Sequence, residues 1–231
     1  MGAIAAGLQA CHTRIEAACR MAGRRPGEVG LLAVSKTFPA AAVREAWQAG
    51  QRAFGESYLQ EAVAKLGELE GLPLDWHFIG PIQSNKTRPI AELFQWVHSI
   101  DRLKLAERLS AARPESLPSL NVLIQVNVGG EASKRGVAPD EALPLARAVM
   151  QLPRLRCRGF MTIPRPADDP MDERGQFAAL RQIYEAARAA GLEVDTLSMG
   201  TSDDLEAAIL EGATLVRIGT AIFGKRAPTE I

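Results

Sequence analysis

Short apolar runs alternate with amphipathic stretches along most of this chain. The first stretch has apolar residues at spacings of three and four, which predicts a helix that buries one face. These residues are Ile4, Leu8, Cys11, Ile15 and Cys19. Gly23 and Pro26 follow, and they predict that the helix ends there.

Eight apolar runs follow this helix as candidate strands. They cover residues 29–34, 53–55, 76–80, 96–100, 122–128, 157–163, 196–200 and 214–219. Helical patterns separate them, for example over residues 39–49 and 59–69. Continuous apolar strands joined by helices indicate parallel strands buried on both faces. Eight such units in about 200 residues predict an α/β fold, a single (β/α)8 TIM barrel, rather than an open doubly wound sheet.

No linker divides the chain. Its richest stretch of Pro, Gly and Ser, residues 164–170, is short enough for one loop. We therefore expect residues 1–231 to form one domain. Within it, we expect residues 1–25 to form an extra helix packed on the barrel and residues 226–231 to form a tail.

Charge, cysteine content and hydropathy exclude several classes of protein. Lys and Arg number 27, as do Asp and Glu, so no net field attracts nucleic acid or an anionic membrane. The 3 cysteines form no CxxC pair, which argues against a disulfide framework and a structural zinc site. Because a signal peptide and a run of about 18 apolar residues are both absent, we expect a cytoplasmic protein.

Lys36 is the strongest candidate for a residue with a chemical role. It stands at the carboxyl end of the first apolar run, in the segment 31–37, and catalytic residues of barrels lie at that end of the strands. An apolar barrel mouth disfavours the ammonium form and leaves a neutral amine that can form an imine with a carbonyl. The alternative is that the side chain leaves the strand and extends into solvent.

A second candidate follows the seventh run and opens a helix. Hydroxyl groups, a glycine and free helix N–H groups can together bind a phosphate, and barrels often bind phosphate at this place. The residues are Ser198, Gly200, Thr201 and Ser202. The alternative is a helix cap between Thr201 and Asp204, which is compatible with a phosphate if Asp203 and Asp204 point away from it.

Arg217 lies in the last apolar run, which Gly219 and Thr220 close. In a closed barrel the last strand lies beside the first, so Arg217 and Lys36 can face one ligand. A buried arginine needs an acceptor, and a pyridine nitrogen would serve. A guanidinium there disfavours protonation of the ring, which would leave a cofactor with such a ring held but weakly activated. The alternative is that Arg217 pairs with a buried carboxylate.

Three other candidates are weaker. Ser57 follows the second run and could reach a bound ring. His77, in the third run, is as readily explained as a hydrogen-bonded interior residue. His98 precedes Asp101 and looks like part of a catalytic triad, but no nucleophile-elbow sequence accompanies it.

Six segments together resemble the pyridoxal phosphate homeostasis protein family, whose barrel is like the N-terminal domain of alanine racemase. They are residues 31–37, 54–61, 76–86, 98–101, 198–204 and 216–224. The resemblance implies pyridoxal phosphate bound as a Schiff base on Lys36, with Arg217 near the pyridine nitrogen. The phosphate would lie near Ser198, Gly200, Thr201, Ser202, Gly219 and Thr220.

The implied role is to bind, buffer and deliver pyridoxal phosphate without an established turnover and without a metal. Partners would be the cofactor and, transiently, apoenzymes that depend on it, and we expect a monomer. Ser57 stands where the family usually has Asn, which puts a ring contact through that amide in doubt. Thr201 stands where the family usually has Met and adds a hydroxyl that could bond the phosphate.

Two enzymatic alternatives stay open at this point. An amino-acid racemase of the same barrel type needs a second base opposite the lysine, and only Tyr58 and Tyr184 could supply a tyrosine. A Schiff-base lyase would instead bind a sugar phosphate directly on Lys36. Bound pyridoxal phosphate, visible as a yellow colour, would separate a cofactor carrier from this lyase.

Overall fold

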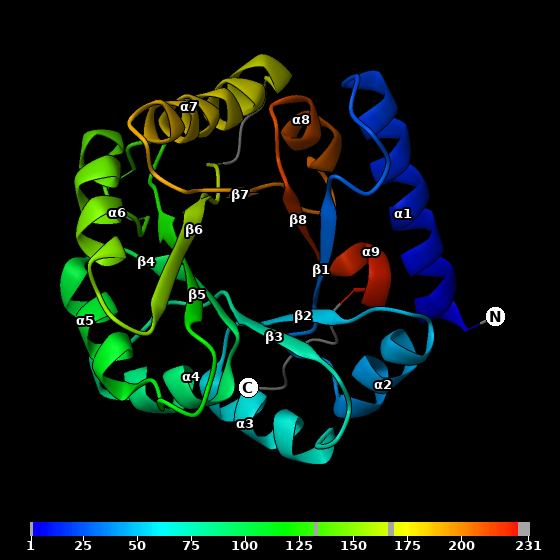
Figure 1. Ribbon diagram of the computed structural model, residues 1–231. Helices are drawn as coiled ribbons and strands as arrows, with labels where there is room; N and C mark the ends of the chain where they lie inside the picture. Colours follow the sequence, from blue (N-terminus) through cyan, green and yellow to red (C-terminus); the bar gives the residue numbers. More distant parts are fainter. Residues whose placement is uncertain (1, 132–133, 166–168, 226–231) are drawn as a thin grey trace.

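The computed structural model describes residues 2–131, 134–165 and 169–225. Its strands form one closed barrel in chain order, and every neighbouring pair is parallel (Figure 1). The strands are β1 Gly30–Val34, β2 Ala53–Glu56, β3 Asp75–Phe78, β4 Trp96–Ile100, β5 Leu120–Gln125, β6 Leu155–Met161, β7 Thr196–Ser198 and β8 Leu215–Ile218. The predicted (β/α)8 barrel is therefore confirmed.

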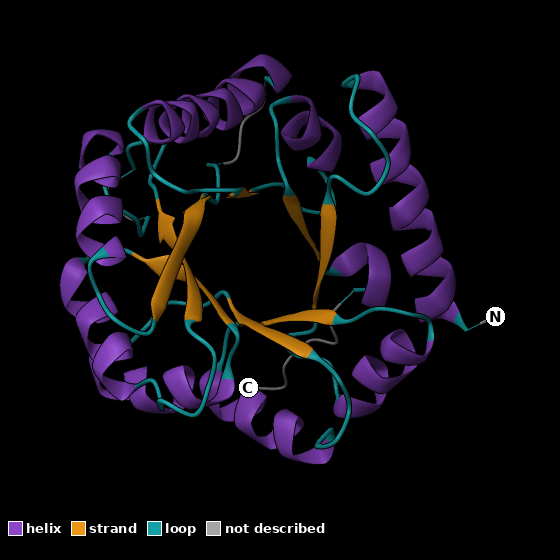
Figure 2. Ribbon diagram, in the orientation of Figure 1, coloured by secondary structure: helices purple, strands orange, loops and turns teal. Residues whose placement is uncertain are grey.

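Helices surround the ring of strands (Figure 2). They are α1 Ala3–Met21, α2 Ala40–Gln48, α3 Leu59–Glu68, α4 Thr87–Leu93, α5 Leu103–Ala112, α6 Ala142–Met150, α7 Pro170–Ala189, α8 Leu205–Leu210 and α9 Thr220–Phe223, with the 3-10 turns η1 Ser84–Lys86 and η2 Pro139–Glu141. Among these described helices, none is long and apolar enough to span a membrane.

Helix α1 precedes the first strand and packs against α2, α8 and α9 (Figure 1). Its predicted apolar stripe is the face that it buries, since Leu8, Cys11, Ile15 and Cys19 all have little exposed surface. The three cysteines are buried and free, so they act as small apolar side chains. The predicted tail, residues 226–231, lies outside the described residues.

Most strand limits differ from the predicted ones by one to three residues. The fifth strand begins at Leu120 rather than at residue 122, and the seventh ends at Ser198 rather than at residue 200. Gly200 has φ +93°, so the chain leaves the extended conformation there although its residues remain buried. Residues stay buried beyond the last hydrogen bond between the strands, so an apolar pattern in the sequence cannot show where a strand ends.

The contact between β6 and β7 requires a glycine at position 159. Gly159 has φ +144°, a conformation that is essentially limited to glycine. A Cβ atom at this position would run into the Thr196 carbonyl oxygen on β7. The pairing of β5 with β6 also shifts register between Val122 and Leu123, where Leu123 lies opposite Gly159.

Replacing Gly159 with alanine should lower the free energy of unfolding by about 3 kcal/mol, because backbone strain and a backbone clash act together. The matched control is Gly175→Ala in the exposed middle of α7, where an added Cβ meets nothing within 4 Å. That change should stabilise the protein by about 0.5–1 kcal/mol. Urea unfolding followed by circular dichroism measures both, and equal midpoints for the two variants would contradict the prediction.

Candidate functional site

A cavity of about 260 Å³ opens at the carboxyl ends of the strands. Its polar lining comes from Lys36, Ser57, Thr201, Ser202, Asp203, Arg217, Gly219 and Thr220, and its apolar lining from Val34, Ile79, Met161 and Ile163. Seven predicted site residues therefore share one cavity. The other two, Ser198 and Gly200, are buried in the wall behind it.

Lys36 lies in a tight turn that begins where β1 ends, and its side chain is half-buried. The next residue, Thr37, has φ +69°, which is rare for a β-branched residue. Its N–H donates to Glu61 Oε1 on α3 at 2.6 Å, and Phe38 N–H closes the turn on the Ser35 carbonyl at 3.1 Å. The turn is thus held from outside in a strained conformation that aims Lys36 at the cavity.

A buried ionic cluster below this turn holds it in place. Lys65 Nζ on α3 donates to Glu56 Oε1 at 2.6 Å, to Glu61 Oε1 at 2.9 Å and to the Ser35 carbonyl at 2.8 Å. Ser35 Oγ donates to the same Glu56 oxygen at 2.6 Å. Burial raises the pKa of the Glu56 carboxyl, and the charge of Lys65 opposes that shift. The cluster therefore joins β1, β2 and α3 beneath Lys36.

The loop after β7 combines a helix cap with part of the cavity wall. The Thr201 N–H and hydroxyl both donate to Asp204 Oδ1, the hydroxyl at 2.9 Å, as the capping alternative requires. Asp203 lines the cavity, so only Asp204 is turned onto the cap. A Cβ atom on Gly200 would lie 2.6 Å from the Ala208 Cβ, so glycine is needed for the loop to pack on α8.

Arg217 points into the barrel interior and is 5% exposed. Its Nη1 donates to Ser198 Oγ at 2.9 Å and its Nη2 to the Thr162 carbonyl at 2.8 Å. Within the described part of the chain, no carboxylate forms an ion pair with Arg217, so these contacts do not support the carboxylate alternative. Burial lowers the pKa of Arg217 to about 10, which leaves it a cation at neutral pH.

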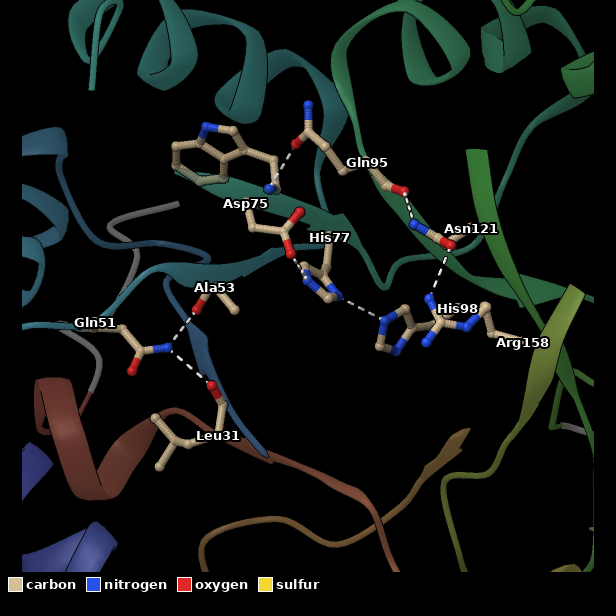
Figure 3. A network of polar contacts seen from close by, with 10 residues as sticks. Leu31, Gln51, Ala53, Asp75, His77, Gln95, His98, Asn121 and Arg158 are labelled. Carbon is tan, nitrogen blue, oxygen red and sulfur yellow. Dashed lines mark hydrogen bonds and ion pairs between the residues drawn. The ribbon is translucent and has the colours of Figure 1, made fainter. Parts of the chain in front are cut away.

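Two histidines continue this chain of contacts through the interior. His98 Nδ1 lies 3.0 Å from Ser198 Oγ, and His98 Nε2 lies 2.9 Å from His77 Nδ1. Figure 3 shows the two rings, with Asp75 beyond them. Burial lowers the pKa of His77 and holds that of His98 well below its usual range, so both are neutral. His98 does not pair with Asp101, whose carboxylate binds Arg102 and Arg135.

The sequence did not reveal the Glu56–Lys65 cluster or the apolar walls of the cavity. The one available signal was the spacing of Glu61 and Lys65, four residues apart on a helix. Such pairs are usually exposed, and here Lys65 is 3% exposed. Among the described residues, no group of three His, Cys, Asp or Glu side chains could hold a metal ion.

Comparison with known proteins decides the family. The model of the alanine racemase N-terminal domain matches residues 7–227. A pyridoxal phosphate homeostasis protein of Pseudomonas aeruginosa is 62% identical over 226 residues, which cover 98% of this chain and 97% of that protein. This chain belongs to the pyridoxal phosphate homeostasis protein family. The resemblance inferred from the six segments is confirmed.

Two further proteins extend the comparison. The pyridoxal phosphate homeostasis protein of Escherichia coli is 53% identical over 234 residues, which cover 98% of each chain. The structure of PipY from Synechococcus elongatus, described as having PLP bound, superposes with a TM-score of 0.79 at 39% identity. It covers 91% of this chain and 100% of that one. The shared fold therefore spans 91% of this chain.

Replacing Lys65 with methionine should lower the free energy of unfolding by about 3 kcal/mol, because it leaves the buried Glu56 carboxylate unpaired. Adding Glu56→Gln should recover most of the loss, since the buried charge is then also removed. Lys104→Met, on the exposed face of α5, is the control and should change little. Urea midpoints measure the effect, and a Lys65→Met midpoint equal to that of Lys104→Met would disprove it.

The buried histidines predict a loss of stability in acid. In the folded protein the pKa values of His77 and His98 lie below the usual 6.5. Below pH 6.5 the unfolded chain therefore binds more protons than the folded protein, which shifts the equilibrium toward unfolding. The free energy of unfolding should therefore fall as the pH drops, by at most about 1.4 kcal/mol per pH unit for each histidine. Chemical unfolding between pH 5 and pH 8 tests this. The fall should be shallower in His98→Asn, and equal slopes would contradict the assignment.

Proposed function

We propose that this protein carries pyridoxal 5′-phosphate as a Schiff base on Lys36 and acts in the cytoplasm to buffer and deliver it. One observation carries the proposal: Lys36, in the turn after β1, and Arg217, on the neighbouring strand β8, line the same cavity together with four hydroxyl side chains. The relatives named as pyridoxal phosphate homeostasis proteins and the PLP-bound structure of PipY support it.

Most of the cavity's lining suits a part of the cofactor. Ser202 and Thr220 offer hydroxyls to a phosphate, and Gly219 has no side chain to obstruct its approach. Asp203, on the same rim, repels a phosphate and weakens its retention. Apolar residues of the wall offer a surface to a flat ring. Phosphate contacts through Ser198, Gly200 and Thr201 have less support, because the first two lie behind the wall and Thr201 bonds Asp204.

Arg217 determines what the site does to a bound ring. A guanidinium has five N–H donors, and the two bonds to Ser198 and Thr162 leave others for a ring nitrogen. Pyridoxal phosphate, when bound, supplies an electron sink whose strength depends on protonation of that nitrogen. A cation beside it disfavours protonation. Arg217 therefore favours retention of the cofactor over catalysis on it.

The tyrosines favour a carrier over a racemase. Tyr58 is 55% exposed and lines a groove beside α3 and α4 instead of the Lys36 cavity. Tyr184 lies on the outer helix α7, where the guanidinium of Arg188 sits 5.8 Å from its ring centre. Neither places a phenol opposite Lys36. We therefore propose that the protein is not an enzyme, since inversion of a stereocentre needs a second proton donor.

We further propose that residues 1–231 act as a single unit and as a monomer. Arg14 on α1 donates to the Ser202 carbonyl at 3.0 Å, so the first helix supports a loop of the site. Large exposed apolar side chains lie on separate elements, as Met21, Tyr58 and Met171 illustrate. Contacts with apoenzymes that accept the cofactor would then be transient.

Reconstitution with pyridoxal phosphate should give a yellow protein whose visible absorption band collapses on borohydride reduction. Peptide mass spectrometry should then find the pyridoxyl group on Lys36, because reduction fixes an imine at the amine that formed it. Lys36→Ala should lose both the band and the adduct. The matched control Lys104→Ala, an exposed lysine of α5, should keep both. A protein that stays colourless, or an adduct that survives Lys36→Ala, would refute the proposal.

A further inference from the structure

A continuous line of polar side chains crosses the interior of the barrel from the cavity to its other end. It runs from Arg217 on β8 through Ser198 on β7 and His98 on β4 to His77 and Asp75 on β3. The successive contacts measure 2.9, 3.0, 2.9 and 3.3 Å. Arg217, Ser198, His98 and His77 are all at most 5% exposed.

The two ends of this line determine where every proton lies. A guanidinium only donates hydrogen bonds, so Ser198 Oγ must accept from Arg217. The Ser198 hydroxyl is then free to donate its own hydrogen to His98 Nδ1. A neutral imidazole that accepts at Nδ1 carries its proton on Nε2, and His98 therefore donates to His77 Nδ1.

The far end requires the same order. Asp75 Oδ2 accepts, so His77 must carry its proton on Nε2 and accept at Nδ1. Figure 3 shows these two contacts, between His98 and His77 and between His77 and Asp75. The Asp75 carboxylate can only accept and the Arg217 guanidinium can only donate, so both ends of the line require the same direction of donation. All four hydrogen bonds run from Arg217 toward Asp75.

Any other proton arrangement breaks the line. If His98 carried its proton on Nδ1, it would donate to Ser198 and accept from His77 at Nε2. The bare Nε2 of His77 would then face the Asp75 carboxylate. A positively charged His98 would be fully buried near the cation of Arg217. The first arrangement places two acceptors against each other and the second places two like charges together, so each breaks the line at one of its contacts.

We propose that Ser198, His98, His77 and Asp75 form a directed hydrogen-bond relay that positions the Arg217 guanidinium toward the cofactor cavity. Arginine is a flexible side chain, and the relay together with the Thr162 carbonyl holds two of its nitrogens. The remaining donors then face the cavity, which Arg217 lines. The effect on a bound ring rests on the proposed function, but the order of the protons does not.

Asp75 gives the relay an end outside the site. Its side chain is 44% exposed at the amino end of β3, whereas the cavity lies at the carboxyl ends of the strands. The negative charge at Asp75 and the positive charge at Arg217 therefore stand at opposite ends of one chain of neutral dipoles. Such chains strengthen each of their bonds. His77 and His98 are accordingly positioning residues rather than catalytic ones.

Histidine nitrogen NMR of the full chain without cofactor tests the order of the protons directly. The sequence has 3 histidines, and exposed His12 on α1 serves as the solvent reference. At pH 7, His77 and His98 should each be neutral with the proton on Nε2 and accept a hydrogen bond at Nδ1. A proton on Nδ1 of either ring, or a charged ring, would overturn the relay. This measurement does not depend on whether the protein binds pyridoxal phosphate.

A matched pair of variants tests the effect on the site. His98→Asn places an amide near the former Nδ1, where it can still accept from Ser198. It should keep most of the affinity for added pyridoxal phosphate, although it loses the contact with His77. His98→Gln extends its amide toward His77 instead and leaves Ser198 without its acceptor. It should shift the band and weaken binding about tenfold, the loss of one hydrogen bond to a charged group.

Two outcomes keep this test separate from the proposed function. If the Asn and Gln variants share one band and one affinity while wild-type protein binds the cofactor on Lys36, the relay is wrong and the carrier function stands. If wild-type protein takes up no cofactor, the carrier function fails and the NMR result alone decides the relay. Urea unfolding of both variants checks that they fold, and should a variant not fold, Ser198→Ala takes its place and should shift the band as His98→Gln does.

Discussion

The pairing of β8 with β1 closes the barrel, and the site depends on that closure. In this register Arg217 lies opposite Leu32, and Ile218 lies opposite Ala33. The chain then needs only a short turn after β1 to bring Lys36 to the same cavity. Two basic side chains from opposite ends of the sequence thus line one cavity, and the buried cation of Arg217 must be held by acceptors because burial penalises charge.

Two connected sets of polar side chains supply acceptors for buried charges in the barrel interior. One set joins Glu56, Lys65 and Ser35 beneath the Lys36 turn. Another joins Arg217 through Ser198 to the histidines of β3 and β4. A buried polar group costs stability unless its partners are present, so each set stabilises only as a whole. The two sets therefore connect several strands around the cavity.

Elements outside the barrel also support the site. Arg14 on α1 binds the Glu206 carboxylate with two nitrogens, at 2.7 and 2.8 Å, and the Ser202 carbonyl with a third. The pairing is bidentate, which fixes direction as well as distance. Helix α1 approaches α9 so closely that a Cβ on Gly7 would lie 2.7 Å from the Ala221 carbonyl oxygen. The first helix therefore braces the loops after β7 and β8.

The sequence by itself determined the eight strands and the first helix, and it singled out Lys36 and Arg217, which line one cavity. The spacing of apolar residues, and a charged residue within an apolar run, are local properties of the sequence. Both can be recognised without knowing what a residue contacts in the fold. Only the tertiary structure decided that Ser198 faces Arg217 and His98, that Thr201 caps onto Asp204, and that Lys65 is buried. Those outcomes depend on strand register and on the rotation of each helix against the barrel. Both are set by packing between residues far apart in the chain, which no local pattern encodes.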